Sequence, residues 1–537
     1  MTMNNQGRPT APSGQGERPM GSTPVETYTG NRGLDHEEGL IFEIGSATRT
    51  GVDLPKPKPV EPRLGGLERT GGIGLPGLSE PETMRHYVRL SRKNYAIDSG
   101  MYPLGSCTMK HNARLNEKMA RLPGFGDIHP LQPQSTVEGA IEAMQLLARY
   151  LLELTGMAAV ALSPKAGAHG ELCGMLAIKA AHAAKGGADR SIVLVPESAH
   201  GTNPATAAFM GYAVKPVPAR DDGTVAADAV KAALSSDVAA IMLTNPNTCG
   251  LFEPEVAEIA RVVHEAGAYF YCDGANFNAI VGKVRPGDLG VDAMHINLHK
   301  TFSTPHGGGG PGSGPVVLSA ALAPFAPLPT RYIVTNTGPA PSQWRLAESQ
   351  GEAERLGETP FGRLTAFHGQ MGMFVRALAY MLSHGADGMR QASEDAVLAA
   401  NYIRAGLRDV MSQPFGDKPC MHEVLFDDGW LEGTGVTTLD FAKAMIDEGY
   451  HPMTMYFPLV VHGAMLIEPT ESESKQSLDQ FIETMRALAA AAKSNGDKSR
   501  FKQAPRLAPR RRLDETRAAR EPKLRWRPAG PVKHAAE

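Results

Sequence analysis

The chain has 537 residues, a net charge of −3 and 21% charged residues. This balance excludes a general electrostatic attraction to nucleic acid or to an anionic membrane. The five cysteines are odd in number and contain no CxxC pair, so neither a disulfide framework nor a metal site is expected. No apolar run is long enough to span a bilayer and the N-terminus has no signal-peptide pattern, which predicts a cytoplasmic protein.

The composition changes along the chain in a way that predicts five segments. They are a disordered extension at 1–35, an arm with helices at 36–130, a large α/β domain at 131–342, a small α+β domain at 343–492 and a basic, irregular tail at 493–537. The extension is polar and rich in Gly, Pro and Thr. The tail is either solvated or a strap between subunits, since it lacks the interleaved aromatic residues of a nucleic-acid-binding segment.

Irregular stretches dominate the arm. Residues 40–45 (LIFEIG) fit a short helix or a short strand. The proline-rich residues 54–62 predict an extended segment that either lies on another subunit or forms a surface loop. Residues 101–110 (MYPLGSCTMK) mix small, aromatic and hydroxyl side chains with little periodicity. Such stretches are often binding loops, and a purely structural role fits the pattern equally well.

Two helices are expected next. Ser135 and Glu138 form a capping-box pattern before an apolar helical run at 140–154, which Gly156 ends. Residues 163–171 (SPKAGAHGE) then precede a helical run at 172–184. Small residues before a helix leave its first N–H groups open to an anion, so this turn is a candidate phosphate site. A glycine-containing turn of this kind is also common without a ligand.

Strands and helices alternate from 192 to 318. The expected elements are strands at 192–195, 239–243, 269–272, 295–298 and 315–318, and a helix at 256–266. The alternation predicts an α/β fold with a mostly parallel sheet between helices. Ligands of such sheets bind at the carboxyl ends of the strands. Polar residues gather at these predicted ends: His200, Asn203, Asp273, Asn276, His299 and Lys300.

From about 343 the pattern becomes helix-rich. Helices are expected at 367–407, at 438–448 and, as the last of the chain, at 475–491. Residues 421–426 (MHEVLF) precede the second of these helices and residues 467–471 (IEPTE) lead to the third, so this part of the sequence predicts the smaller α+β domain.

Asp273 and Lys300, together with the candidate phosphate site, point to pyridoxal phosphate. A lysine amine can form a Schiff base with the aldehyde of this cofactor. An aspartate can keep the pyridine nitrogen protonated, and an imidazole such as His200 can stack on the ring. Each residue alone has an ordinary interpretation, because most lysines are solvated and many aspartates cap turns. Their order on alternating strands favours the cofactor.

Five stretches carry a family resemblance: 101–109 (MYPLGSCTM), 196–203 (PESAHGTN), 273–279 (DGANFNA), 297–302 (NLHKTF) and 306–312 (HGGGGPG). In these stretches, and across about 40–526, the chain resembles the glycine-cleavage P-protein family, glycine dehydrogenase (decarboxylating). The resemblance implies the fold-type I architecture of pyridoxal phosphate-dependent transferases. The family occurs as one long chain or as two half-length subunits, and this chain resembles the half that bears the lysine.

The resemblance implies roles for eight residues. Lys300 would bind the cofactor covalently and Asp273 would pair with its pyridine nitrogen. His200 would stack on the ring, Thr202 would help to hold the cofactor, and His299 precedes the lysine as in related enzymes. The phosphate contacts would come from Ala166, Gly167 and Ala168.

The resemblance also implies a reaction and partners. Glycine would lose carbon dioxide, and its aminomethyl group would pass to the lipoyl arm of the H-protein. The partners would be the lysine-less subunit 1, in an α2β2 heterotetramer, and the lipoylated H-protein, whose arm would enter near the glycine-dense loop 307–314. Two alternatives remain open: another amino-acid decarboxylase or aminotransferase that uses pyridoxal phosphate, and a non-catalytic subunit that scaffolds an active partner.

Overall fold

The structure is a computed structural model that describes residues 38–46, 48–61, 63–306, 312–334 and 342–525. The predicted extension at 1–35, most of the glycine-dense loop (307–311) and residues 526–537 therefore lie outside the described residues. The chain forms two compact units. One comprises 96–442 and 450–496, and the other comprises 1–95, 443–449 and 497–537. None of the described helices is long and apolar enough to cross a membrane.

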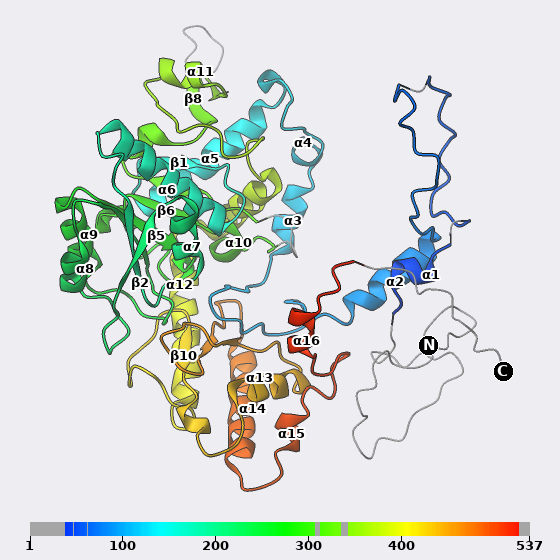
Figure 1. The fold of residues 1–537 in the computed structure, drawn as a ribbon, viewed down its shortest axis with the longest axis vertical. Helices are drawn as coiled ribbons and strands as arrows, with labels where there is room; N and C mark the ends of the chain where they lie inside the picture. Colours follow the sequence, from blue (N-terminus) through cyan, green and yellow to red (C-terminus); the bar gives the residue numbers. More distant parts are fainter. Residues whose placement is uncertain (1–37, 47, 62, 307–311, 335–341, 526–537) are drawn as a thin grey trace. The chain divides into compact units, whose positions relative to one another are not determined.

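A seven-stranded sheet lies at the centre of the larger unit, in the order β1-β7-β6-β5-β4-β2-β3 (Figure 1). Strands β3, β2, β4, β5 and β6 run parallel, whereas β7 is antiparallel to β6 and to β1. The strands are β1 (Ala159–Ala161), β2 (Ile192–Pro196), β3 (Ala213–Val217), β4 (Val238–Thr244), β5 (Tyr269–Gly274), β6 (Ala293–Ile296) and β7 (Val316–Leu318). The mostly parallel sheet and its return strand confirm the prediction, although β1 and β3 were not expected.

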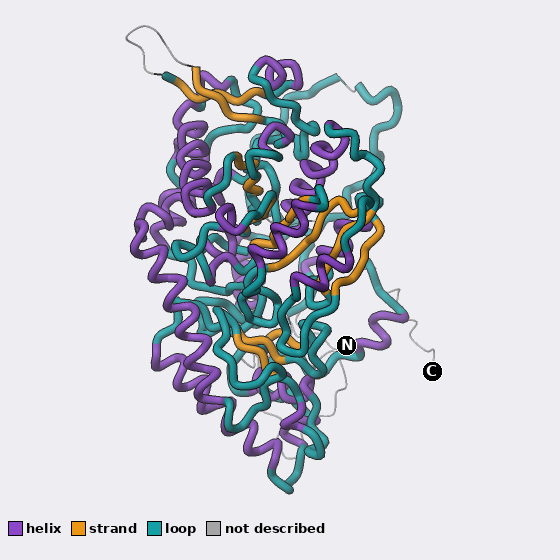
Figure 2. The backbone as a smooth tube through the Cα atoms, turned by 90° about the vertical axis from the view of Figure 1, so that its left-hand side faces the viewer, coloured by secondary structure: helices purple, strands orange, loops and turns teal. Residues whose placement is uncertain are grey.

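Helices cover both faces of this sheet, as Figures 1 and 2 show. They include α5 (Glu138–Thr155), α6 (Gly167–Ala184), α7 (Thr202–Phe209), α8 (Ala227–Ala233), α9 (Val256–Glu265) and the long α12 (Met371–Leu407). Alternate residues of β4 enter different cores: Ile241 packs in the cluster with α5, α8 and α9, and Met242 in the cluster with α6. Every β4 residue is buried, which explains its continuous apolar sequence.

A three-stranded antiparallel sheet, β10-β12-β11, forms a second layer of the same unit. Its strands are β10 (Val424–Phe426), β11 (Thr454–Met455) and β12 (Met465–Ile467), and α14 (Lys475–Lys493) follows them. Helix α12 is kinked at Gly385, where the backbone is left-handed (φ 64°). The remaining elements of the unit are α3 (Arg114–Ala120), α4 (Pro123–Gly126), the hairpin β8 (Thr330–Val334) and β9 (Gln343–Ala347), and α11 (Gln350–Arg355).

The smaller unit contains few elements. They are α1 (Ile41–Ile44), α2 (Glu80–Ser91), α15 (Ser499–Lys502) and α16 (Glu515–Arg520), while α13 (Thr438–Asp447) begins in the larger unit. The segment at 40–45 is thus helical, and 54–61 has no helix or strand. The helix predicted at 475–491 is confirmed as α14, but α15 and α16 follow it, so the prediction that it is the last helix was wrong.

Two local predictions were wrong near the sheet. Ser135 lies in a 3₁₀ turn, and α5 begins at Glu138 without a side-chain cap. The Glu138 carboxylate instead accepts a hydrogen bond from Arg345 at 2.8 Å, a contact that only the folded chain provides. The strand predicted at 295–298 ends at Ile296, and Leu298–Thr301 forms one helical turn, α10. Lys300 therefore lies on a short helix just after the strand.

Candidate active site

A cavity of about 180 Å³ lies at the carboxyl ends of β4, β5 and β6. Six of the eight predicted site residues line it: Gly167, Ala168, His200, Thr202, Asp273 and Lys300. The structure thus brings together residues from α6, α7, β5 and α10. The cavity is also lined by eight residues outside this predicted set: Ser106, Glu171, Thr244, Thr248, Ala275, Asn276, His295 and Asn297.

Asp273 lies at the end of β5 and is only 3% exposed. Its Oδ2 accepts a hydrogen bond from the Asn203 amide at 3.1 Å, and its Oδ1 accepts one from the backbone N–H of Ala275 at 2.9 Å. Burial by itself raises the pKa of Asp273, but His295, these two donors and the charge of Lys300 together bring it below its ordinary value. The carboxylate is therefore ionised although it is buried.

His295 is the neighbour of Asp273 across the β5–β6 pair, and its Nε2 lies 3.3 Å from Asp273 Oδ1. Its other nitrogen, Nδ1, lies 2.7 Å from the hydroxyl oxygen of Tyr271. Burial lowers the pKa of His295, so the ring is neutral. Because Nε2 faces a carboxylate, it carries the proton, and Nδ1 accepts from Tyr271. The imidazole thereby orients Asp273 without adding a full positive charge.

The first turn of α6 lies directly over this pair. A Cβ on Gly167 would lie 2.9 Å from Asn297 Oδ1 and 3.2 Å from His295 Nε2, and a Cβ on Gly170 would lie 2.6 Å from His295. A Cβ on Gly174 would likewise lie 2.6 Å from the ring of Tyr271. These three glycines share one face of α6 and allow the helix to approach the sheet closely. The N–H groups at the start of this 18-residue helix consequently open onto the cavity.

His200 lies at the opposite wall and is held by Thr202. The backbone N–H and the hydroxyl of Thr202 lie 3.2 Å and 2.6 Å from His200 Nδ1, so this nitrogen is an acceptor. Partial burial lowers the pKa of His200, which leaves a neutral ring with its proton on Nε2. The ring of Phe457 contacts it edge to face at 5.4 Å. The imidazole plane is thus fixed before any ligand binds.

Lys300 is half-buried, and its Nζ donates a hydrogen bond to the Ser106 carbonyl oxygen at 2.8 Å. Ser106 belongs to the irregular stretch 101–110, for which both a binding and a structural role remained open. The contact brings this stretch to the cavity beside the reactive amine.

Two predicted residues do not line the cavity. Ala166 precedes α6 in an extended conformation. His299 faces away from the cavity, with its Nδ1 accepting from the Ser313 backbone N–H at 3.3 Å and its ring 5.1 Å from that of His306. Burial lowers the pKa of His299 to about 3. The contacts of these two residues with a cofactor stay predictions.

Glu171 lines the cavity and has a shifted pKa, although the sequence analysis did not assign it to the site. It is 2% exposed, accepts from the Thr206 hydroxyl at 3.1 Å, and burial followed by the charge of Asp273 raises its pKa to about 7. The only feature of the sequence that could have identified Glu171 as a site residue is its position in the predicted phosphate turn. His295 could have been identified more easily, since it begins the predicted strand that ends at Lys300.

The cavity fits pyridoxal phosphate by its donor set. Three lining atoms, Thr244 Oγ1, Asn276 Oδ1 and Asn297 Oδ1, are buried without a hydrogen-bond partner among the described residues, which is typical of a polar ligand site. An ionised carboxylate, an amine, a helix N-terminus and a fixed imidazole surround the space. The sheet order and this site define a fold-type I enzyme of the pyridoxal phosphate-dependent class.

Comparisons with known proteins narrow this class. Residues 170–309 match the family Aminotransferase class-V, and residues 392–509 match the family Glycine dehydrogenase, C-terminal domain. A probable glycine dehydrogenase (decarboxylating) subunit 2 of Caulobacter vibrioides is 68% identical over 537 residues, which is 100% of both chains. The protein of that name from Caldanaerobacter subterraneus is 47% identical over 501 residues, covering 92% of this chain and 99% of its own. The chain belongs to the family of glycine dehydrogenase (decarboxylating) subunit 2.

Solved structures agree on the fold. A glycine decarboxylase (P-protein) of the glycine cleavage system, in inhibitor-bound form, superposes with a TM-score of 0.63 at 19% identity, covering 82% of this chain and 92% of its own. An aspartate aminotransferase from Thermus thermophilus gives a TM-score of 0.51 at 14% identity, covering 73% and 99%.

Proposed function

We propose that this chain is the cofactor-bearing, catalytic half of a glycine decarboxylase, with pyridoxal phosphate bound covalently at Lys300. The observation that carries the proposal is that the Lys300 amine and the ionised Asp273 carboxylate line one cavity in a chain of this family. The substrate is glycine, and the acceptor of its aminomethyl group is the lipoyl arm of an H-protein.

The residues present divide the work of this reaction. Bound pyridoxal phosphate supplies the electron sink that takes up the electron pair left when carbon dioxide departs from glycine. Asp273 holds a proton on the ring nitrogen, and His295 keeps that carboxylate oriented. The N-terminal turn of α6 binds the phosphate through backbone N–H groups at Gly167 and Ala168.

Lys300 and His200 act nearer to the substrate. Lys300 supplies the amine that holds the cofactor aldehyde and that glycine must displace. The Ser106 carbonyl would hold the free Lys300 amine at the position that it occupies here. His200, which lines the cavity, would stack on the cofactor ring. In the transfer step the electron pair of the aminomethyl carbon would form a bond to one lipoyl sulfur, the sulfur–sulfur bond would break, and the other sulfur would take up a proton as a thiol.

The proposed partners are the lysine-less subunit 1, in an α2β2 heterotetramer, and the lipoylated H-protein, whose arm enters near the glycine-dense loop. No nucleic acid or membrane partner is proposed. The proposed compartment is the cytoplasm, because all five cysteines are free thiols and a reducing compartment keeps them so.

The test combines this chain, subunit 1 and lipoylated H-protein and measures glycine–carbon dioxide exchange. We expect exchange only with all three components, and Lys300→Ala should abolish it along with covalent cofactor capture. Release of free methylamine without H-protein would indicate a plain decarboxylase. Full exchange with the Lys300→Ala chain would indicate a scaffolding subunit and would overturn the proposal.

A further inference from the structure

The loop that carries Ser106 is fastened to the three-stranded sheet. Leu104 forms a bridge with Ile467 of β12, and the Thr454 hydroxyl donates to the Gly105 carbonyl at 2.7 Å. A Cβ on Gly105 would lie within 2.5–2.7 Å of three Leu466 atoms, so only glycine fits there. These contacts therefore fix the position of the loop where it reaches the cavity.

Beyond that point its backbone is strained. Ser106 and Thr108 have φ of 66° and 44°, in the left-handed region that residues with a Cβ avoid. Each of their N–H groups donates to a buried carboxyl: Ser106 to Glu423 Oε2 at 2.7 Å and Thr108 to Glu468 Oε2 at 2.9 Å. A hydrogen bond to a buried carboxyl stabilises the conformation that makes it, which offsets the backbone strain. These two carboxyls thus hold the loop in its conformation.

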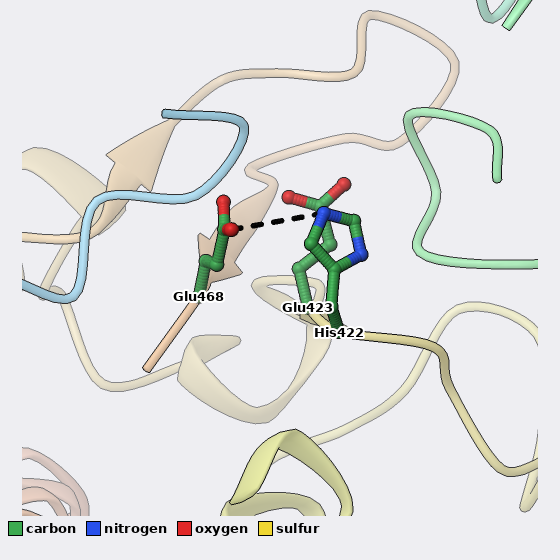
Figure 3. Close-up of side chains that lie close together, drawn as sticks. All are labelled: His422, Glu423 and Glu468. Atoms are coloured by element: carbon green, nitrogen blue, oxygen red, sulfur yellow. Dashed lines mark ion pairs between the residues drawn. The ribbon is translucent and has the colours of Figure 1, made fainter. Parts of the chain in front are cut away.

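Glu423 and Glu468 are direct neighbours. Glu423 precedes β10 and Glu468 follows β12, and these antiparallel strands pair Val424 with Ile467, so the two carboxyls lie at the same edge of the sheet (Figure 3). Both residues are 0% exposed, and in the part of the chain that the structure describes neither forms an ion pair with a lysine or arginine. Two adjacent buried carboxylates without an ion-pair partner repel each other, which disfavours the ionisation of both.

The groups around Glu423 and Glu468 indicate the protonation state of these two carboxyls. His422, also 0% exposed, has its Nε2 3.7 Å from Glu468 Oε1, too far for a hydrogen bond. Both of its ring nitrogens and Glu468 Oε1 have no hydrogen-bond partner among the described residues. Burial lowers the pKa of His422, whereas burial and then Glu468 raise that of Glu423 well above its ordinary value. The groups that face Glu423 are Glu468, the Ser106 amide, Lys300 and Asn276.

We propose that Glu423, as a neutral carboxylic acid beside Glu468, is a positioning residue that fixes the Ser106 carbonyl against the amine of Lys300. It acts through one residue: Glu423 accepts a hydrogen bond from the Ser106 backbone N–H, and the Ser106 carbonyl oxygen accepts one from the Lys300 amine. The Lys300 amine is then aimed at the position of the incoming aldehyde. The inference rests on the proposed function only in taking Lys300 as the cofactor-binding residue.

The test measures covalent capture of the cofactor and protection of the loop. The cofactor-free chain is mixed with pyridoxal phosphate, quenched with borohydride at set times, and the modified Lys300 peptide is quantified by mass spectrometry. Hydrogen exchange is followed in the peptide that covers 101–110. Loss of a hydrogen bond to a buried acid predicts that Glu423→Ala slows capture at least about ten-fold and speeds exchange in the loop. Glu423→Gln, which keeps the shape and an acceptor oxygen without a charge, should restore capture to within about three-fold.

Asp292→Ala is the matched control. Asp292 is 6% exposed and accepts from the Phe270 N–H at 2.8 Å at the opposite end of β6, so its loss removes a buried carboxyl far from the loop. This variant should lose thermal stability but keep the rate of capture. If Glu423→Ala does not fold, Thr454→Val tests the same loop through the Gly105 carbonyl and should slow capture several-fold.

Four results would overturn the proposal. They are a folded Glu423→Ala variant with the wild-type capture rate, a Glu423→Gln variant as slow as Glu423→Ala, a Thr454→Val variant that captures normally, and a stoichiometric divalent metal found by elemental analysis of the purified chain. The metal would mean that a cation, rather than a proton, neutralises the pair. Neither readout uses glycine or H-protein, so normal capture without glycine decarboxylation would count against the proposed function alone.

Discussion

Two regions of this protein bury carboxyl groups and put them in opposite protonation states. At the ends of β5 and β6, Asp273 is surrounded by His295, two N–H donors and the charge of Lys300, and its pKa is lowered despite burial. At the edge of the three-stranded sheet, Glu423 faces a second carboxyl, and its pKa is raised. Burial acts in the same direction in both places. The partners decide the outcome, so two buried carboxyls of the same structural unit can differ in charge.

Removing the charge at Asp273 abolishes the ionised carboxyl of this comparison and should have the largest effect on activity. Asp273→Asn keeps the shape but cannot hold a proton on the ring nitrogen, so we expect glycine–carbon dioxide exchange to fall at least about 100-fold. Covalent capture of the cofactor at Lys300 should persist, which mass spectrometry after borohydride treatment would show. An exchange rate within a few-fold of the wild type would mean that another group protonates the ring.

A third carboxyl, only three residues from Glu468, shows what a cation does in this region. Lys110 is 4% exposed, forms an ion pair with Glu471, and donates to Asn278 Oδ1 at 2.8 Å. Burial alone would raise the pKa of Glu471, but the lysine lowers it. Glu471 is therefore ionised although Glu423 is not.

Lys110→Met leaves the Glu471 carboxylate buried without its cation. We expect the free energy of unfolding to fall by about 3–5 kcal/mol, measured by chemical denaturation. The double variant Lys110→Met with Glu471→Gln should recover part of this loss, because no charge remains. A single variant as stable as the wild type would show that the pair contributes nothing to the fold.

A smaller effect is expected at Glu171, another buried carboxyl, in the pH dependence of the free energy of unfolding. The pKa of Glu171 rises from its ordinary value near 4.5 to about 7 in the fold, so the folded state favours the protonated form. Its contribution to stability is fully present below the unfolded pKa and declines as pH rises toward about 7. At 1.36 kcal/mol for each pH unit, the decline is roughly 3 kcal/mol.

Glu171→Gln removes this titration. In the cofactor-free chain, the melting temperature of the variant relative to the wild type should therefore rise between pH 5 and pH 8, by a few degrees. The control is Glu352→Gln, since Glu352 is partly exposed and its pKa is lowered, so it has no such decline in this range. A constant difference between Glu171→Gln and the wild type would show that Glu171 is ionised throughout.

Much of the fold could be predicted from the sequence. The apolar strands that become β2, β4 and β5 and the helix that becomes α9 appear within a few residues of their predicted positions, because full burial on both faces leaves an unbroken apolar run. The strand β3 was missed. It lies at the edge of the sheet and most of its residues, 213–217, are exposed, so it has no continuous apolar run. The sequence analysis placed Lys300 directly at the end of a strand, whereas it lies on the helix α10 that follows. This helix has only four residues, so it shows no periodicity of its own in the sequence.

The sequence by itself determined the places of the candidate residues Gly167, His200, Asp273 and Lys300 beside predicted strand and helix ends, because local runs of apolar residues mark those ends. Only the tertiary structure decided what these residues contact. Ser106 lies 194 residues from Lys300 and 317 from Glu423, yet its backbone carbonyl oxygen and N–H bond to the one and the other. Local patterns contain no information about partners at such separations; packing selects them, and in a buried site the partner fixes whether a carboxyl holds a proton.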